Sequence, residues 1–249
     1  MAVNNVSIVE TTPINKSKYC IIGVPDVGLV GVIASSYIVS SLNMTEIGYF
    51  ESEMFPPIIV VHEGNPKSFF RIYQKDDIVV ITSEIPLQSQ VIPSTARAIV
   101  DWAKTKNIEL LISLTGIAVQ NRLEINVPSV YGVGNNKAVM DLLNKANVES
   151  FEEGFMVGLH ALIMKESSKN ALQNMILLAQ SHYQYPDPAA AASIIDSINK
   201  FLSIKVDTSQ LLAEAEEIRL KTRELMQRTQ RSMQKTQKDQ EQEIPGMYA

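Results

Sequence analysis

The chain has 249 residues, 45% of them hydrophobic, which is enough for one large domain or two small ones with a sizeable core. Its formal net charge of −5 argues against a nucleic-acid-binding protein, since such proteins normally present a basic face. No stretch approaches the roughly 18 uninterrupted apolar residues of a membrane span, and no signal peptide is visible at the start. Cys20 is the only cysteine, so neither an intrachain disulfide nor a cysteine-based metal cluster can form. We therefore expect a cytoplasmic protein that contacts neither membrane nor nucleic acid.

Short apolar runs alternate with stretches whose apolar residues recur at helical spacing along most of the chain. Strands are expected at residues 18–24, 46–50, 57–62, 69–73, 78–81, 108–114, 127–133 and 175–179. Helices are expected at residues 30–41, 93–106 and 155–164. A further helix that carries Val139 to Ala146 is expected after the turn at 134–136, and another is expected to start at Pro186-Asp187-Pro188 and to reach Leu202. This alternation predicts an α/β domain, residues 1–206, with a mainly parallel sheet covered by helices on both faces.

A glycine-rich turn separates the first strand from the first helix, with Gly23, Gly28 and Gly31 in the sequence GVPDVGLVG. Glycines in this position can cradle a phosphate at a helix N-terminus. The spacing fits neither the dinucleotide fingerprint nor the P-loop. Tight packing of the strand against the helix explains the glycines equally simply, and we favour that interpretation.

Residues 207–240 predict a projecting helix. Asp207 and Gln210 have the spacing of a capping box. A seam with alternating steps of four and three residues follows. Its apolar members, which we assign to oligomerisation, are Leu211, Ala215, Ile218 and Leu225. Its polar members are Thr222, between Ile218 and Leu225, and then Thr229, Ser232 and Thr236. We expect the first half of this helix to pack on neighbours and the second half to be loose.

Residues 241–249 form a predicted docking tail that ends in Met247, Tyr248 and Ala249. Pro245 and Gly246 stop any helix before it. The methionine can fill an apolar slot, the tyrosine supplies a rigid ring with a hydroxyl, and a terminal carboxylate can pair with a lysine or with backbone amides. A frayed end without a role is the alternative.

Residue types that could carry catalysis are present but scattered. The three histidines, His62, His160 and His182, show no metal-ligand spacing. We interpret His160 as a satisfied core residue and His182 as a loop residue, and the same reasoning makes Cys20 a buried apolar side chain. Three carboxylates could line a cleft or simply lie on the surface: Glu84, Asp101 and Glu124. No cofactor is indicated.

Five blocks in a fixed order resemble the archaeal proteasome-assembly-chaperone family. They are GVPDVGLVG at 23–31, FPPIIVVHEG at 55–64, YGVGN at 131–135, GFMVGLHAL at 154–162 and YPDPAAA at 185–191. The chain departs from the family pattern at Asp26, where small residues are common, at Asn135, where threonine is expected, and at Gln180-Ser181, which replace a more acidic ending.

The resemblance implies a core like that of nucleoside phosphorylases but without their activity, and homo-oligomers that are tetramers or pentamers. It also implies ATP-independent binding to the 20S proteasome core particle. In that setting Met247-Tyr248-Ala249 matches the hydrophobic-Tyr-any tail that inserts between adjacent α subunits, where a lysine receives the carboxylate.

Three hypotheses for the function follow. The first is a proteasome chaperone or activator, not an enzyme, that binds through the tail. The second is a nucleosidase-like hydrolase or phosphorylase, which requires an open cleft at residues 23–31. The third is a purely structural module in which the heptad helix only drives oligomerisation.

Overall fold

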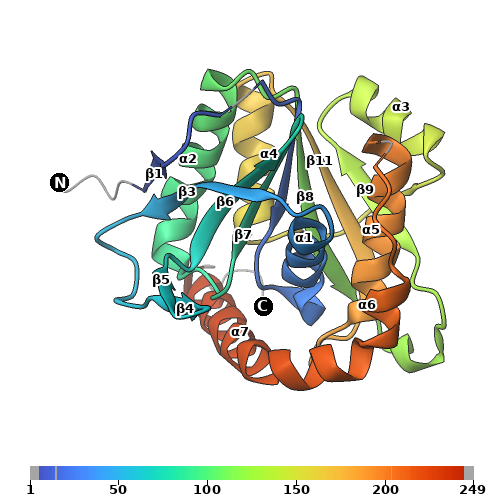
Figure 1. Cartoon of the computed structure of the whole chain (residues 1–249). Coiled ribbons are helices and arrows are strands. Elements are labelled where there is room, and N and C mark those ends of the chain that lie inside the picture. The colour runs from blue at the N-terminus through green and yellow to red at the C-terminus, as the bar shows by residue number, and fades with distance from the viewer. Residues whose placement is uncertain (1–5, 15, 203, 244–249) are drawn as a thin grey trace.

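The protein folds around one large sheet with helices on both faces (Figure 1). The computed structural model describes residues 6–14, 16–202 and 204–243, with side chains through Gln234 in the last helix. The strands are β1 (Ser7–Glu10), β2 (Tyr19–Gly23), β3 (Thr45–Glu51), β4 (Val60–His62), β5 (Asn65–Lys67), β6 (Phe70–Lys75), β7 (Ile78–Ser83), β8 (Leu110–Ala118), β9 (Val130–Gly134), β10 (Glu149–Ser150) and β11 (Gln173–Ser181). The helices are η1 (Val27–Leu29), α1 (Val30–Ser41), η2 (Ser89–Val91), α2 (Ile92–Thr105), η3 (Arg122–Glu124), α3 (Lys137–Lys145), α4 (Leu159–Lys169), α5 (Pro188–Leu202), α6 (Ser209–Ala213) and α7 (Ala215–Glu243).

The sheet has nine strands in the order β1-β3-β6-β7-β2-β8-β11-β9-β10. Its centre, β7-β2-β8-β11, is parallel, as the alternation of strands and helices predicts. The strands on either side of this centre, β6 and β9, pair with it in antiparallel fashion. Consequently the carboxyl ends of the central strands meet at one edge of the sheet.

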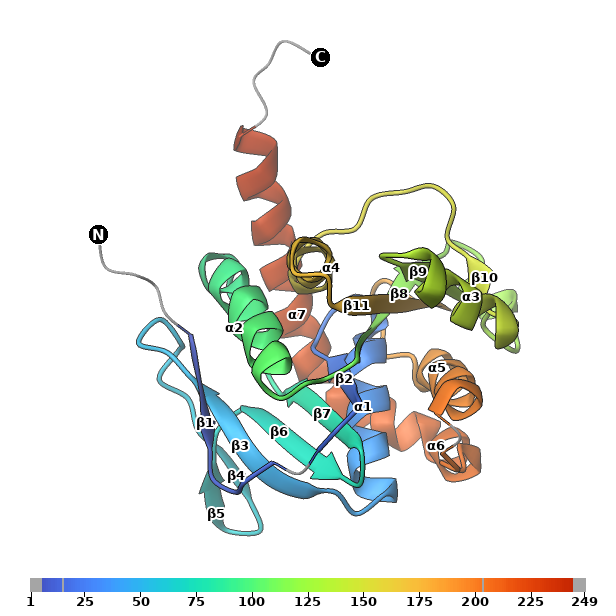
Figure 2. The ribbon, with the colours of Figure 1, turned by 90° about the horizontal axis from the view of Figure 1, so that it is seen from above.

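The central strands have apolar residues on both faces because helices cover both. In β2, Ile21 packs into the cluster that contains α1 and α5, whereas Cys20 and Ile22 pack into the cluster that contains α2 and α4. Figure 2 shows these two helical layers on opposite sides of the sheet. Cys20 is fully buried in the apolar core, as predicted, and this burial raises the pKa of its thiol.

Most of the predicted elements form, and the exceptions have physical causes. Residues 57–59 are not a strand; β4 starts only at Val60 and pairs with β5 across the two-residue turn Glu63-Gly64, both with positive φ. The helix predicted at 155–164 begins only at Leu159, because Gly158 has a φ of 80° that ends the preceding loop. Phe155, expected in a buried helix, is 99% exposed. β1 and β10, edge strands without a strong apolar pattern, were not predicted.

The last helical segment also begins differently from the prediction. Asp207 accepts a hydrogen bond from the amide of Ser209, and the N-cap of α6 is Thr208, so the predicted capping box does not form. Gln210 instead donates to Glu214, the residue at which α6 ends before α7 starts. No helix among the described residues is long and apolar enough to cross a membrane.

The glycine-rich turn is filled by packing, as favoured from the sequence. A Cβ added to Gly31 would lie 2.3 Å from the carbonyl oxygen of Leu114, and one added to Gly23 would lie 2.1 Å from the carbonyl oxygen of Gly31. Gly28 has a φ of 62°, and a Cβ there would meet the Ser181 hydroxyl at 1.9 Å. These glycines let η1 and α1 approach β2, β8 and β11, and they leave no cradle for a phosphate.

We expect Gly31→Ala to lower the free energy of unfolding by about 1–3 kcal/mol, because its methyl group would force α1 away from the β8 backbone. Urea denaturation measures this change. The control Ser36→Ala alters an exposed position on the same helix and should shift stability by less than about 0.5 kcal/mol. Equal stability of Gly31→Ala and wild type would show that α1 is not held by this close approach.

Candidate functional site

Helix α7 crosses the edge of the sheet at which the central parallel strands end (Figure 1). Its first turns lie on the side of α1 and α5, and Ser232, further along, donates a hydrogen bond at 3.5 Å to the carbonyl of Leu87, just before α2. In Figure 2 the last turns of α7 extend beyond the other elements. The helix is thus anchored on the body at one end and projects from it at the other.

The seam assigned to oligomerisation is largely used within the chain. Leu211 is buried, and Ile218 and Leu225 pack on the cluster formed by α1 and α5. Ala215 is half-buried. The opposite side carries Leu220, which is 64% exposed. Contact of the seam residues with a second copy remains a prediction.

Packing of α7 continues past Leu225, further than the sequence suggests. Met226 and Thr229 are buried against the body. The Thr229 hydroxyl donates to the carbonyl of Leu225, and the Thr222 hydroxyl donates to the carbonyl of Ile218. These bonds satisfy the hydroxyl groups within the helix, so the polar part of the seam can face the protein. Because Thr222 and Thr229 are polar, the sequence pattern did not indicate that this face of α7 packs against the body.

A buried ion pair fixes the loops against which α7 begins its crossing. Asp187 is fully buried and accepts two hydrogen bonds from Arg122, at 2.7 Å from Nε and 2.9 Å from Nη2. The same carboxylate accepts from the amide of Ala190, which caps α5, and from the amide of His182. The Asp187 amide donates to the carbonyl of Gly28. One aspartate therefore joins the glycine turn, η3, the end of β11 and the start of α5.

Sequence reasoning found only part of this cluster. The block YPDPAAA marks Pro186 and Pro188 as the start of a helix, and α5 does begin at Pro188. Nothing in the spacing identifies Arg122 as the partner of Asp187, since 65 residues separate them. The sequence shows only that each is a charged residue in a connecting segment, Arg122 after β8 and Asp187 before α5. His182 is a loop residue, as predicted, and its amide belongs to the same cluster.

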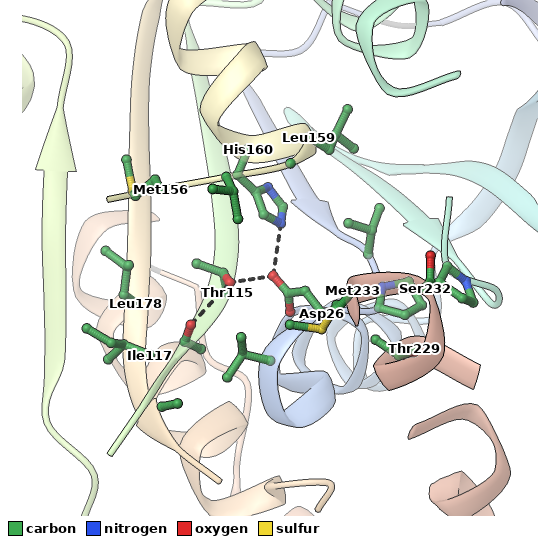
Figure 3. A pocket seen from close by; sticks show the side chains of 18 of the residues that line it. Asp26, Thr115, Ile117, Met156, Leu159, His160, Leu178, Thr229, Ser232 and Met233 are labelled. Atoms are coloured by element: carbon green, nitrogen blue, oxygen red, sulfur yellow. Dashed lines mark hydrogen bonds and ion pairs between the residues drawn. The ribbon is translucent and has the colours of Figure 1, made fainter. Parts of the chain in front are cut away.

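A pocket of about 520 Å³ lies between the carboxyl ends of the central strands, the start of α4 and α7 (Figure 3). Its polar group consists of Asp26, Thr115 and His160. The Thr115 hydroxyl donates to Asp26 Oδ2, and His160 Nε2 lies 3.4 Å from the same oxygen. Asp26 Oδ1 and both ring nitrogens of His160 are buried and have no hydrogen-bond partner among the described residues. His160 is therefore buried as predicted, but it is not satisfied.

The Asp26 carboxyl has a raised pKa because burial disfavours its charged form, an effect that His160 and Thr115 reduce. Other carboxylates considered from the sequence do not join this group. Glu84 pairs with Arg71 and lies 2.8 Å from His62, at the β4–β5 side of the molecule. Asp101 and Glu124 are exposed. The described residues contain no group of three potential metal ligands.

The glycine positions are filled by packing and leave no phosphate cradle, which counts against the enzyme hypothesis. The pocket nevertheless includes residues 24–27 of the same turn, with the Asp26 carboxyl among its lining groups. It has no arginine or lysine among its described lining residues. A phosphate would find no cation there.

We expect Asp187→Ala to lower the free energy of unfolding by about 3–5 kcal/mol, because it leaves the Arg122 guanidinium buried without a counter-charge and removes the cap of α5. Chemical denaturation measures the change. Asp196→Ala, also on α5 but exposed, serves as the control and should change stability by less than about 1 kcal/mol. A loss for Asp187→Ala no larger than that of the control would contradict the role given to the pair.

Asp26→Asn is expected to stabilise the protein at pH 8 and to have a smaller effect at pH 4. Because the folded pKa is raised, ionisation of Asp26 disfavours the folded state increasingly as pH rises above the usual aspartate range. Removing one kcal/mol of this cost would raise the melting temperature by about 2–4 °C. Thermal denaturation at both pH values, with exposed Asp141→Asn as the control, measures it. A lower melting temperature at pH 8 would show that the ionised carboxylate stabilises the fold.

Comparison with known proteins places this geometry among related structures. Pyrococcus furiosus PbaA, an archaeal homolog of proteasome-assembly chaperone, matches with a TM-score of 0.85 and 29% identity, covering 92% of this chain and 99% of PbaA. Pyrococcus furiosus PbaB, an archaeal proteasome activator, matches with a TM-score of 0.75 and 19% identity over 90% of this chain and 99% of PbaB, which is a likeness of fold alone.

A relative from Methanocaldococcus jannaschii, the uncharacterized protein MJ0106, is 30% identical over 199 residues, which make up 80% of this chain and 81% of that protein. The model of the PAC2 family matches residues 20–226, from β2 to Met226 within α7. The chain therefore belongs to the PAC2 family.

Proposed function

We propose that this protein is an ATP-independent chaperone or activator of the 20S proteasome core particle, acting in the cytoplasm and without enzymatic activity of its own. Its support is membership of the PAC2 family together with the fold shared with PbaA, an archaeal homolog of proteasome-assembly chaperone. The observation that carries the proposal beyond the family is the course of α7, whose last turns extend beyond the body, with the proposed docking residues following it in the sequence.

The tail is proposed to dock through Met247, Tyr248 and Ala249 between adjacent α subunits. These residues lie outside the part of the chain that the structure describes. The described helix runs for 29 residues, which corresponds to about 43 Å at 1.5 Å per residue. Because Met226 and Thr229 hold α7 on the body, the direction of the stalk is set by the fold. A short tail that follows such a stalk can reach a socket on a partner without unfolding the body.

Several copies are proposed to act together. A homo-oligomer, tetramer or pentamer, would present several tails to one ring, and binding of the first would raise the effective concentration of the others. Tails that bind weakly one by one would then hold the complex, provided that their spacing matches the sockets. The spacing of the α7 helices in the oligomer, rather than the affinity of a single tail, would then decide whether the complex forms.

Tyr248→Ala is expected to reduce co-sedimentation with purified archaeal 20S core particles by at least about tenfold, because each aromatic anchor supplies on the order of 2 kcal/mol and the loss is repeated in every subunit. Size-exclusion chromatography of the same variant should show the oligomer unchanged.

Phe155→Ala is the matched control, since it removes an exposed aromatic ring from the body and not from the tail. It should bind core particles as wild type does. Undiminished binding of Tyr248→Ala would rule out docking through the tail, and loss of binding in Phe155→Ala alone would place the contact on the body.

A further inference from the structure

The pocket that contains Asp26 and His160 lies where open α/β sheets generally bind ligands, outside the carboxyl ends of parallel strands. β2 leads into Asp26, β8 contributes Thr115 and Ile117, and β11 contributes Leu178. The volume of about 520 Å³ is within the range of small-molecule sites. Proteasome docking through the tail does not use this pocket.

The polar end of the pocket contains groups that lack partners. His160 is only 6% exposed, and neither of its ring nitrogens has a hydrogen-bond partner among the described residues. The same holds for Asp26 Oδ1. Buried polar atoms are nearly always paired, and an exception calls for an explanation. Asp26, whose side chain is 20% exposed, and His160 both line one pocket, so a polar group of a bound molecule can reach this unsatisfied pair there.

The rest of the lining defines the chemistry of that group. Ile117, Met156, Leu178 and Met233 give the pocket apolar walls. Arginine and lysine are absent from the described lining residues, so an anionic ligand would face Asp26 without compensation. A cationic ligand would compete with His160 for the one carboxyl. A hydroxyl or amide group can both donate to Asp26 and satisfy the imidazole.

Helix α7 closes the pocket on one side. Thr229, Ser232 and Met233 belong to its lining, and Figure 3 shows them opposite the strands that carry Thr115 and Ile117. A molecule in the pocket would therefore contact both the sheet and α7, and it could leave only by the open rim or after α7 lifts.

We propose that this pocket binds a small uncharged molecule, largely apolar and bearing a hydroxyl or amide group, and that α7 is its cover. The polar group lies against Asp26 and His160, and the apolar body lies against Ile117, Leu178 and Met233. A bound molecule contacts the strands on one side and α7 on the other, and so it holds α7 against the sheet edge.

The test uses a series of phenyl compounds that differ only in the polar group: 2-phenylethanol, phenylacetamide, phenylacetate and 2-phenylethylamine. Ligand-observed NMR titration of the full chain should give dissociation constants of about 1 mM for the alcohol and the amide, as expected for molecules of this size. The two charged compounds should bind about tenfold more weakly. No saturable binding of the neutral compounds, or tighter binding of a charged one, would overturn the proposal.

Two variants locate the binding. Ile117→Trp fills the pocket from β8 and Met233→Trp fills it from α7, so either one should abolish binding even if the other fails to fold. Val127→Trp adds the same ring at a position that is 78% exposed and outside the pocket, and it should bind as wild type does. Unchanged binding by a folded pocket variant would place the compounds elsewhere and overturn the assignment.

Amide hydrogen exchange tests the cover. With 2-phenylethanol at about ten times its dissociation constant, the amides of residues 222–234 should exchange about tenfold more slowly, because lifting α7 would release the ligand. Unchanged exchange there, with binding established, would show that α7 does not close over the ligand. None of these measurements involves the core particle, so they stand or fall apart from the proposed function.

Discussion

The buried carboxylate of Asp187 holds the sheet edge on which the proposed activity depends. It pairs with Arg122, caps α5 and binds the amide of His182, while its own amide reaches the glycine turn. A paired charge at zero exposure is stable only while every partner is in place. The loops that follow the central strands are therefore fixed together, and they form a firm base for the helix that crosses them.

Helix α7 packs on this base and projects from it in a direction that the packing fixes. Its apolar residues pack on the layer of α1 and α5, its small polar residues pass over the pocket, and its last turns extend beyond the body. The seam residues thus pack mainly within the chain. A contact with a second copy would also have to involve the exposed face of α7, which carries Leu220. Helix α7 covers the pocket and also precedes the tail in the chain. A ligand in the pocket and a partner bound to the tail would therefore both contact segments joined by this helix.

The parallel centre of the sheet and its helical layers could be predicted, because buried strands such as β7 and β8 are unbroken apolar runs bounded by turns. The close packing at Gly31 could also be predicted, since the spacing excluded the known phosphate loops. Contacts between distant residues could not: Arg122 and Asp187, or Asp26 and His160, meet only through the topology. The loop at Phe155 was mistaken for helix because apolar composition does not distinguish an exposed apolar loop from a buried turn of helix.

The central claim is that the folded body positions copies of one C-terminal anchor for the sockets of the proteasome ring. A cryo-electron-microscopy map of the protein bound to 20S core particles tests it most directly. The account predicts density for Met247, Tyr248 and Ala249 between adjacent α subunits, continuous with α7 and with the body held off the ring. A map in which the body itself rests on the ring while these sockets are empty would contradict it.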